Sequence, residues 1–210
     1  MNDSRFVIFL VDDDPGVLKA LSRILDTKGY EVRAFSSSAE FLAQHDPSIP
    51  GCAIFDVSMP ELDGIELQAA LKAGGVERPV IFITGVGDIP VSVQAMKAGA
   101  IDFLTKPVKS QQLLAAVALA AEKEARALEL RGELASVNDR ISKLTPRERE
   151  VLTHVIAGRL NKQIAADLGT VEKTIKLHRG RMMRKMGVRT VADLVRVAQR
   201  GGIEPSRTRD

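Results

Sequence analysis

The sequence is poor in residues that build covalent cross-links and aromatic cores. One cysteine, Cys52, occurs in 210 residues, which excludes an internal disulfide, a zinc finger and a thiol redox pair. Tryptophan is absent and aromatic residues make up only 4% of the chain, so we expect an aliphatic core. No apolar run approaches the roughly 18–20 residues of a membrane-spanning helix, and the N-terminus lacks the plan of a signal peptide. We therefore expect a cytoplasmic protein with no membrane partner.

The charge is divided unevenly along the chain, although the net charge is only +3. Residues 1–120 carry 15 acidic and 10 basic side chains, whereas residues 121–210 carry 12 acidic and 20 basic ones. A basic half suggests contact with a polyanion, most simply nucleic acid. A solvated basic surface explains the charge equally well on its own.

The first half alternates short apolar runs with segments of helical periodicity. Strands are predicted at residues 6–11, 31–35, 53–55, 80–83 and 101–104, of which 6–11, 53–55 and 80–83 are continuous apolar runs and 31–35 alternates. Continuous apolar strands that alternate with helices are typical of a parallel sheet covered on both faces. The sequence therefore predicts an α/β, doubly wound, five-stranded parallel sheet over residues 5–120.

Carboxylate, hydroxyl and ammonium side chains end or follow four of these strands. Asp12 and Asp13 end the first strand, Asp56 the third, Thr84 the fourth and Lys106 the fifth. Ligands of parallel sheets gather at the carboxyl ends of the strands, so we expect the five side chains in one cleft. Three converging carboxylates favour a hard cation, Mg²⁺ above all. One carboxylate could then attack phosphorus, while Lys106 and Thr84 contact phosphoryl oxygens.

The second half contains only helical signals. Residues 121–143 are predicted to form a helical linker, on which apolar side chains are spaced by four and three. These side chains are Leu130, Leu134, Val137, Ile141 and Leu144. A linker helix that pairs in a dimer is the favoured interpretation, and a helix that packs on its own domain is the alternative.

Residues 144–201 are predicted to form a separate all-α domain of four helices, near 146–157, 161–168, 171–186 and 190–200. Thr145, Pro146 and Glu148 form a capping-box start of the first helix. The third helix has a basic outer face and follows a helix and a tight turn, as the recognition helix of a helix-turn-helix does. A merely solvated basic helix is the alternative. The polar tail, residues 202–210, is predicted to be disordered.

The first half resembles the receiver domain of bacterial response regulators. The resemblance rests on Leu10-Val11-Asp12-Asp13-Asp14, on Phe55-Asp56 through Asp63-Gly64, on Ile83-Thr84-Gly85 and on Asp102-Phe103-Leu104-Thr105-Lys106-Pro107. It implies that Asp56 accepts a phosphoryl group from the phosphohistidine of a sensor histidine kinase. It implies that Asp13, Asp56 and the Ser58 carbonyl bind Mg²⁺, with Asp12 acting through water. Thr84 and Phe103 fall at the two switch positions of the family.

The second half resembles the LuxR-type helix-turn-helix domain. The resemblance rests on residues 144–152, on Asn161-Lys162-Gln163-Ile164-Ala165, on Leu168-Gly169 and on residues 174–178. Together the two halves resemble the FixJ/NarL class of two-component regulators. They are nearer to FixJ in the sequence of residues 87–103. This resemblance implies DNA binding, with base contacts from Lys176, Leu177 and Gly180, and with Arg179 or Arg181 as substitutes. The residues implied to hold phosphates are Asn161, Lys162, Lys173, Thr174 and His178.

One position departs from that pattern. Val171 stands where the family usually has a Ser or Thr that caps the recognition helix, and a lost cap costs about 1 kcal/mol. Thr170, one residue earlier, is a candidate to replace it.

The leading hypothesis is therefore a phosphorylation-switched transcription regulator and not a turnover enzyme. Its expected partners are a sensor kinase, promoter DNA, RNA polymerase and a second copy of the chain upon phosphorylation. The expected dimer face includes Val93, Met96, Lys97 and Asp102. The alternatives are a phosphatase with Asp12 as nucleophile and Asp14 as acid, and an interaction module that is never phosphorylated.

Overall fold

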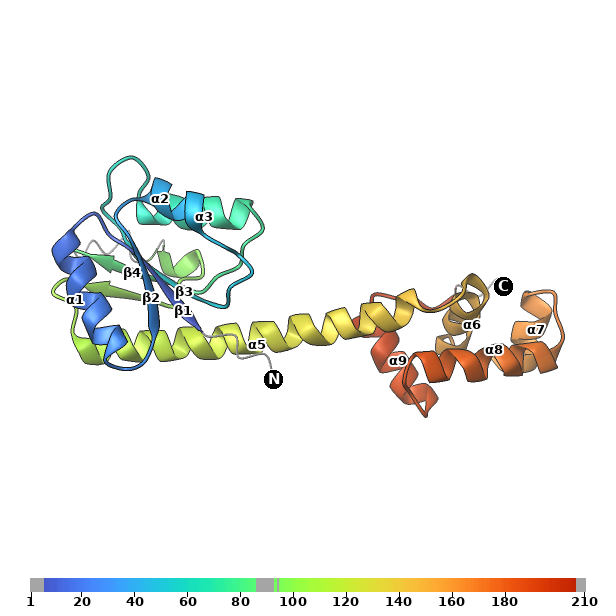
Figure 1. Cartoon of the computed structure of the whole chain (residues 1–210). Helices are drawn as coiled ribbons and strands as arrows, with labels where there is room; N and C mark the ends of the chain where they lie inside the picture. The colour runs from blue at the N-terminus through green and yellow to red at the C-terminus, as the bar shows by residue number, and fades with distance from the viewer. Residues whose placement is uncertain (1–5, 86–92, 94, 207–210) are drawn as a thin grey trace. The chain divides into compact units, whose positions relative to one another are not determined.

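The chain divides into two compact units, residues 1–127 and 128–210. The computed structural model describes residues 6–85, 93 and 95–206. Figure 1 shows a sheet with helices in the first unit and helices alone in the second. Within the described ranges, no helix is long and apolar enough to span a membrane. Of the segment 87–103, on which the nearer resemblance to FixJ rests, residues 87–92 and 94 lie outside the described residues.

Five parallel strands form one sheet in the order β2-β1-β3-β4-β5. They are β1 (Val7–Val11), β2 (Glu31–Phe35), β3 (Gly51–Asp56), β4 (Val80–Thr84) and β5 (Asp102–Thr105). The strands β1, β3 and β4 are buried along their whole length. The predicted doubly wound sheet is thus confirmed. The chain reverses its direction of winding between β1 and β3, where sheets of this order bind ligands.

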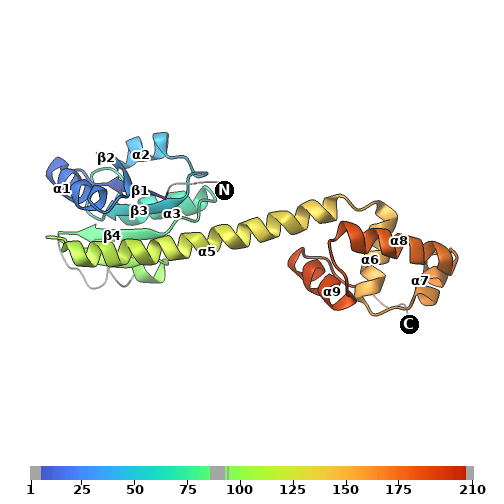
Figure 2. The same cartoon turned by 60° about the horizontal axis from the view of Figure 1, so that its bottom comes forward.

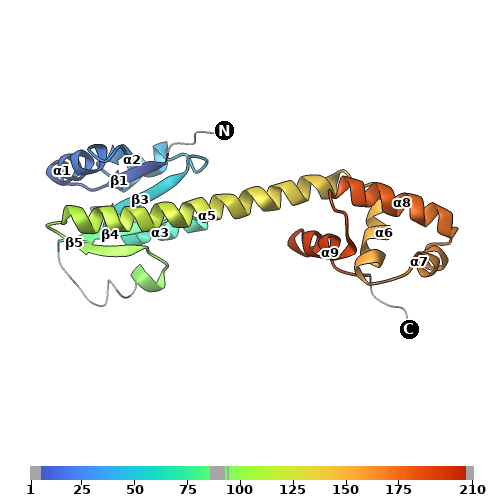
Figure 3. The same ribbon diagram turned by 90° about the horizontal axis from the view of Figure 1, so that it is seen from below.

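Helices cover both faces of the sheet. On one face lie α1 (Pro15–Asp26) and the first part of α5 (Ser110–Ser142), whose buried side chains share one apolar cluster (Figures 1 and 3). On the other face lie α2 (Ser38–Gln44) and α3 (Gly64–Ala73), which contribute to a second cluster. Because parallel strands end at the same edge, the residues that end or directly follow β1, β3, β4 and β5 lie there.

The core on the α2/α3 face is aromatic, which corrects the expectation of an aliphatic core. All seven phenylalanines of the chain occur in its first 103 residues, and five of them are buried in this cluster. They are Phe9, Phe35, Phe41, Phe55 and Phe82. The alternation of side chains along a strand explains the segregation, since Phe9 and Phe55 point to one face and their neighbours Ile8 and Ile54 to the other. The low overall aromatic content concealed this concentration.

A histidine is held neutral at the edge of this aromatic cluster. The half-buried His45 accepts a hydrogen bond from Arg78 Nε at 3.0 Å, and its ring lies 4.8 Å from that of Phe41. Burial, together with the Arg78 charge, lowers the pKa of His45 to about 4. Protonation in the folded state would place a second cation against the guanidinium.

This pKa predicts a pH-dependent stability of the first unit. In the unfolded chain His45 titrates near its ordinary pKa of 6.5, so between pH 6.5 and pH 4 the unfolded state binds more protons. The free energy of unfolding should therefore fall as the pH falls, by about 1 kcal/mol between pH 7 and pH 5, because partial exposure of the ring reduces the full effect. Urea denaturation at both pH values, with His45→Gln beside the wild type, checks this. An unchanged pH dependence in His45→Gln would contradict it.

The helix α5 belongs to both units, and the linker is shorter than predicted. Residues 128–136 are exposed without interruption, whereas Glu124 is buried in the first unit and Val137 in the second. The predicted apolar seam is divided accordingly. Leu130 and Leu134 are 61% and 45% exposed, but Val137, Ile141 and Leu144 lie in or against the core of the second unit. The alternative of a helix that packs on its own domain therefore holds for the last two turns of α5.

The second unit contains four further helices, α6 (Pro146–Ile156), α7 (Asn161–Asp167), α8 (Glu172–Lys185) and α9 (Val191–Arg200). They match the four predicted helices to within one residue at each end. In Figures 2 and 3, α7 and α9 lie toward opposite ends of α8, and α6 packs against α8. The buried side chains of α8, Ile175 and Met182, face this small apolar core.

The segment after α9 differs from the predicted disordered tail. Ile203 packs against the core of the second unit, and the backbone N–H of Ser206 donates to the Thr153 carbonyl at 3.1 Å. The Ser206 hydroxyl also lies 3.2 Å from His154 Nδ1. One apolar residue in a polar segment is enough to attach it here, which composition alone did not indicate. Residues 207–210 lie outside the described part of the chain.

Candidate functional site

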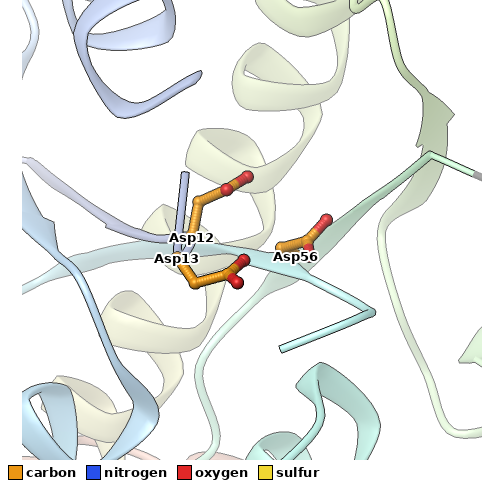
Figure 4. Close-up of side chains that lie close together, drawn as sticks. All are labelled: Asp12, Asp13 and Asp56. Carbon is orange, nitrogen blue, oxygen red and sulfur yellow. The ribbon is translucent and has the colours of Figure 1, made fainter. Parts of the chain in front are cut away.

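Three carboxylates meet at the end of the sheet where β1 and β3 stop. Asp12 directly follows β1 and is fully buried, Asp13 is exposed, and Asp56 is the last residue of β3. One ligand oxygen from each lies within 4.8 Å of the others. Figure 4 shows the three side chains grouped at the ends of these two strands. The sequence prediction that these residues come together is borne out by the geometry.

Lys106 bridges two of the carboxylates. Its Nζ lies 2.8 Å from Asp12 Oδ2 and 2.9 Å from Asp56 Oδ1. Burial alone lowers the pKa of Lys106, but the two carboxylates outweigh it and raise the pKa above its ordinary value. The ammonium therefore stays charged between the two carboxylates.

The charge balance of this pocket suits a cation. Burial raises the pKa of Asp12 against the opposing effects of Lys106 and the Asp14 N–H, and the charge of Asp56 raises it further. One ammonium faces three carboxylates, so the ionised pocket carries an excess of negative charge. The donors are all oxygens, which Mg²⁺ prefers. The pocket is therefore compatible with Mg²⁺.

The loop between β3 and α3 is held close to Asp56 by a hydrogen bond and by a glycine. The Ser58 N–H donates to Asp56 Oδ2 at 3.1 Å, which leaves Oδ1 toward Lys106. Gly64 begins α3 against the last residue of β3, and a Cβ at this position would lie 2.3 Å from the Asp56 carbonyl oxygen. Asp63 caps α3 and forms a capping box with Glu66. A glycine is needed here because any side chain would push the helix away from Asp56.

Of the other residues assigned to this unit, Thr84 falls at the same edge, whereas Asp102 begins β5 at the other end of the strand. Thr84 is buried at the end of β4. Phe103 is half-buried on β5, with its ring centroid 6.4 Å from that of Phe82. Val93 and Met96 are nearly half exposed and lie before β5 in the chain, and Lys97 is exposed too. Asp102 uses its carboxylate to accept from the N–H of Phe103.

The second candidate site is the exposed face of α8. Lys173, Lys176 and Arg181 are exposed, Thr174, His178 and Arg179 are half-buried, and Leu177 is exposed although it is apolar. Gly180 is exposed as well, and nothing lies within 4 Å of the position where a Cβ would be. On α7, Lys162 is exposed and Asn161 half-buried. An outer helix face with exposed cations and a glycine that leaves space beside the backbone is suited to a DNA groove.

Two contacts at this surface refine the assignments made from sequence. Arg179 Nη1 donates to Asn161 Oδ1 at 2.9 Å, which ties α8 to the start of α7 and engages a residue considered for base contacts. The cap of α8 is Val171, which forms no side-chain cap hydrogen bond, so the predicted departure is real and the helix does not begin earlier at Thr170. Its first turn therefore leaves backbone N–H groups available to other partners.

Sequence reasoning missed the ion pair that fixes the end of α8. Glu148 is buried, its Oε2 accepts from the Thr145 N–H at 2.9 Å, and Lys185 Nζ lies 2.6 Å away. Burial alone would raise the pKa of Glu148, but Lys185 and Thr145 outweigh it and hold the pKa below its ordinary value. The capping box was visible in the sequence. Lys185 lies 37 residues further on, and nothing in the spacing pointed to it.

Removing this carboxylate should destabilise the second unit. Glu148→Ala leaves Lys185 without its partner and α6 without its capping box. We expect the free energy of unfolding of the second unit to fall by about 2 kcal/mol. This is less than the loss for a fully buried ion pair, because the Lys185 side chain is about one-third exposed. Glu150→Ala, an exposed position on the same helix, is the matched control and should cost less than about 1 kcal/mol. Amide hydrogen exchange of α6 and α8 in the full chain measures the loss of stability in each variant. Equal losses in Glu148→Ala and Glu150→Ala would contradict a stabilising role of the Glu148–Lys185 ion pair.

Comparison with known proteins assigns both units. The family model described as response regulator receiver domain matches residues 8–118, and the model of bacterial regulatory proteins of the luxR family matches residues 142–198. Nodulation protein W of Bradyrhizobium diazoefficiens is 40% identical over 98% of the chain and 90% of its own length. Response regulator protein TodT of Pseudomonas putida is 43% identical over 95% of the chain and 88% of its own length.

Solved structures agree with these relatives. The chain is similar to the response regulator StyR, with a TM-score of 0.86 and 42% identity over 93% of this chain and 98% of that one. It is also similar to full-length FixJ from B. japonicum, with a TM-score of 0.57 and 37% identity over 94% and 97% of the two chains.

Proposed function

Because the chain belongs to the response regulators that join a receiver domain to a LuxR-type DNA-binding domain, we propose that Asp56 is its phosphoacceptor. The family implies a sensor kinase as the partner of the first unit and DNA as the ligand of the second. The proposal rests on one observation above all. Asp56 ends a central strand, and its Oδ1 faces Lys106 at 2.9 Å.

The chemistry follows from the positions of these side chains. A carboxylate oxygen of Asp56 attacks the phosphorus of the kinase's phosphohistidine, and the P–N bond breaks as the P–O bond forms. Lys106 then neutralises a phosphoryl oxygen, and the Thr84 hydroxyl donates to another. Asp12, Asp13, Asp56 and the Ser58 carbonyl would hold Mg²⁺, which screens the carboxylates from the incoming phosphoryl group. Asp12 would contribute to this site through water.

Phosphorylation is proposed to act on the surface that includes Val93, Met96, Lys97 and Asp102. A phosphoryl group adds about 1.5–2 negative charges and competes with Asp12 for Lys106. Thr84 moves toward it, and the half-buried ring of Phe103 moves further inward. This shift reshapes the surface and promotes dimerisation. The dimer then presents two α8 helices to promoter DNA and to RNA polymerase.

Self-association should therefore strengthen when the chain is phosphorylated. Sedimentation velocity of the full chain with Mg²⁺, with and without acetyl phosphate, measures the change. Since the modification shifts an existing equilibrium, the unmodified chain should dimerise weakly at high concentration. Met96→Glu, an exposed position, should oppose dimerisation without removing the phosphoacceptor. Identical sedimentation with and without acetyl phosphate would overturn the proposed dimer face.

The phosphatase alternative has little support from the geometry. Its nucleophile, Asp12, shares Lys106 with Asp56, and this alternative leaves Asp56 without a role. Its acid, Asp14, is used as the cap of α1, where its carboxylate accepts from the Gly16 and Val17 N–H groups. Turnover of a chromogenic phosphate ester would favour this alternative. Selection of bound genomic DNA by the phosphorylated chain tests the regulator directly, and we expect enrichment of specific promoter fragments.

A further inference from the structure

The loop between β3 and α3 contains a turn whose backbone conformation is unfavourable for its central residue. Glu61 has a φ of 68°, and within the described part of the chain no other residue except glycine has a positive φ. The Leu62 N–H donates to the Pro60 carbonyl at 2.8 Å, so these three residues form a γ-turn. A γ-turn with a positive φ at its centre is the rare, strained form, and it persists where neighbouring contacts hold it.

One buried hydroxyl reaches this turn from α2. Ser38 is the first residue of α2 and is only 3% exposed, and its Oγ donates to the Leu62 carbonyl at 2.8 Å. The same oxygen lies 4.0 Å from Sδ of Met59, which is buried in the aromatic cluster on the α2/α3 face. The hydroxyl therefore contacts the loop on both sides of Glu61.

The two serines that precede Ser38 have other roles. Ser37 is the N-cap of α2, and its hydroxyl accepts from the Glu40 N–H at 3.1 Å. Ser36 is exposed, and its hydroxyl donates to the Glu40 carboxylate at 3.1 Å. Because Ser37 already caps the helix, the start of α2 does not depend on the Ser38 hydroxyl. The contact of that hydroxyl with the loop therefore serves the loop and not the helix.

This loop carries part of the carboxylate site. The Val57 N–H donates to the Ile83 carbonyl at 2.9 Å, and the Gly64 N–H donates to the Val57 carbonyl at 3.2 Å, so both ends of the loop are fixed. Between them lies Ser58, whose N–H donates to Asp56 Oδ2 and whose carbonyl is a proposed Mg²⁺ ligand. With the ends fixed, the conformation of the turn decides the direction of that carbonyl.

We propose that Ser38 is a positioning residue for the Mg²⁺ site and acts through the β3–α3 loop. Its hydrogen bond offsets the strain at Glu61 and keeps the loop in one conformation around Ser58. A left-handed backbone costs a non-glycine residue about as much free energy as one hydrogen bond contributes, so the two effects nearly balance. Without the hydroxyl, part of the population has a relaxed turn, and the apparent affinity for Mg²⁺ falls with the competent fraction. This inference rests on the proposed function, which assigns Mg²⁺ to these residues.

The test is a titration of the full chain with Mg²⁺, followed by the amide NMR signals of Asp13 and Ser58. Alanine fits the space of the serine, and Ser38→Ala should weaken Mg²⁺ binding about fivefold, as expected for one hydrogen bond. The Leu62 amide closes the turn, so it should exchange with solvent faster relative to the amides of β3. A loss of stability alone does not lower the affinity of the molecules that stay folded, so the Mg²⁺ affinity reports the loop.

Ser36→Ala is the matched control, because it removes an exposed hydroxyl next to α2 that does not contact the loop. It should bind Mg²⁺ like the wild type. Adding Glu61→Gly to Ser38→Ala should restore the affinity to within about twofold of the wild type, since glycine adopts a positive φ without strain.

Equal affinities of Ser38→Ala and Ser36→Ala, or no recovery in the double variant, would overturn the role of Ser38. A wild type without saturable Mg²⁺ binding would overturn it as well. Failure of the proposed function has a different signature, namely a wild type that binds Mg²⁺ but is not phosphorylated on Asp56 by acetyl phosphate.

Discussion

Asp56→Asn is expected to abolish phosphorylation of the chain by acetyl phosphate and Mg²⁺. The asparagine side chain retains the shape of the aspartate but has no carboxylate oxygen to attack phosphorus. Intact-protein mass spectrometry should show one added phosphoryl group on the wild type and none on the variant.

The matched control is Asp63→Asn. Asp63 lies seven residues further along the chain and caps α3, and asparagine caps a helix about as well as aspartate. This variant should be phosphorylated like the wild type. Phosphorylation of Asp56→Asn at the wild-type rate would remove Asp56 as the phosphoacceptor, and loss in both variants would indicate a general disturbance of the β3–α3 loop.

The placement of the carboxylates could be predicted from sequence because of a property of parallel sheets. Each strand of such a sheet runs in the same direction, so residues that follow different strands meet at one edge. Asp12 and Asp56 lie 44 positions apart, yet their proximity required only that both strands be identified. The same reasoning located Thr84 and Lys106.

Side-chain partners across the fold could not be predicted in this way. Lys106 was expected to contact a phosphoryl group, but nothing in the sequence indicated that it bridges Asp12 and Asp56 beforehand. The pairing of Lys185 with Glu148 and the contact of Arg179 with Asn161 likewise depend on how helices cross. Such contacts are decided by tertiary packing and rotamers, which local periodicity does not describe.

The end of the linker shows the same limit. The spacing of Leu130, Leu134 and Val137 is that of a coiled-coil seam, and it cannot distinguish a partner helix from the helix's own domain. In the structure Val137 is buried in the core of the second unit, while Leu130 stays exposed. A periodic apolar face therefore does not show which of its side chains are covered, or by what, until the fold is known.

Lys176→Ala is expected to lower the affinity for the specific DNA site by about 1–3 kcal/mol while changing the affinity for random DNA little. Lys176 is exposed one turn into α8, on the side away from the buried Ile175 and Met182. From that position its ammonium can reach the edge of a base in the major groove. Arg179 is less able to take its place, because its guanidinium donates to Asn161.

Lys162→Ala separates base recognition from backbone binding. Lys162 is exposed at the start of α7, where its ammonium can bind a phosphate of the DNA backbone. Such a contact does not distinguish one base sequence from another. Its loss should weaken specific and random binding equally and lower the slope of log affinity against log salt by about one. The decisive quantity is the ratio of specific to random affinity, measured for both variants at several salt concentrations. If Lys176→Ala leaves this ratio unchanged, α8 does not read the bases through Lys176. The uncapped start at Val171 would then be the place to look for a shift of the helix in the groove.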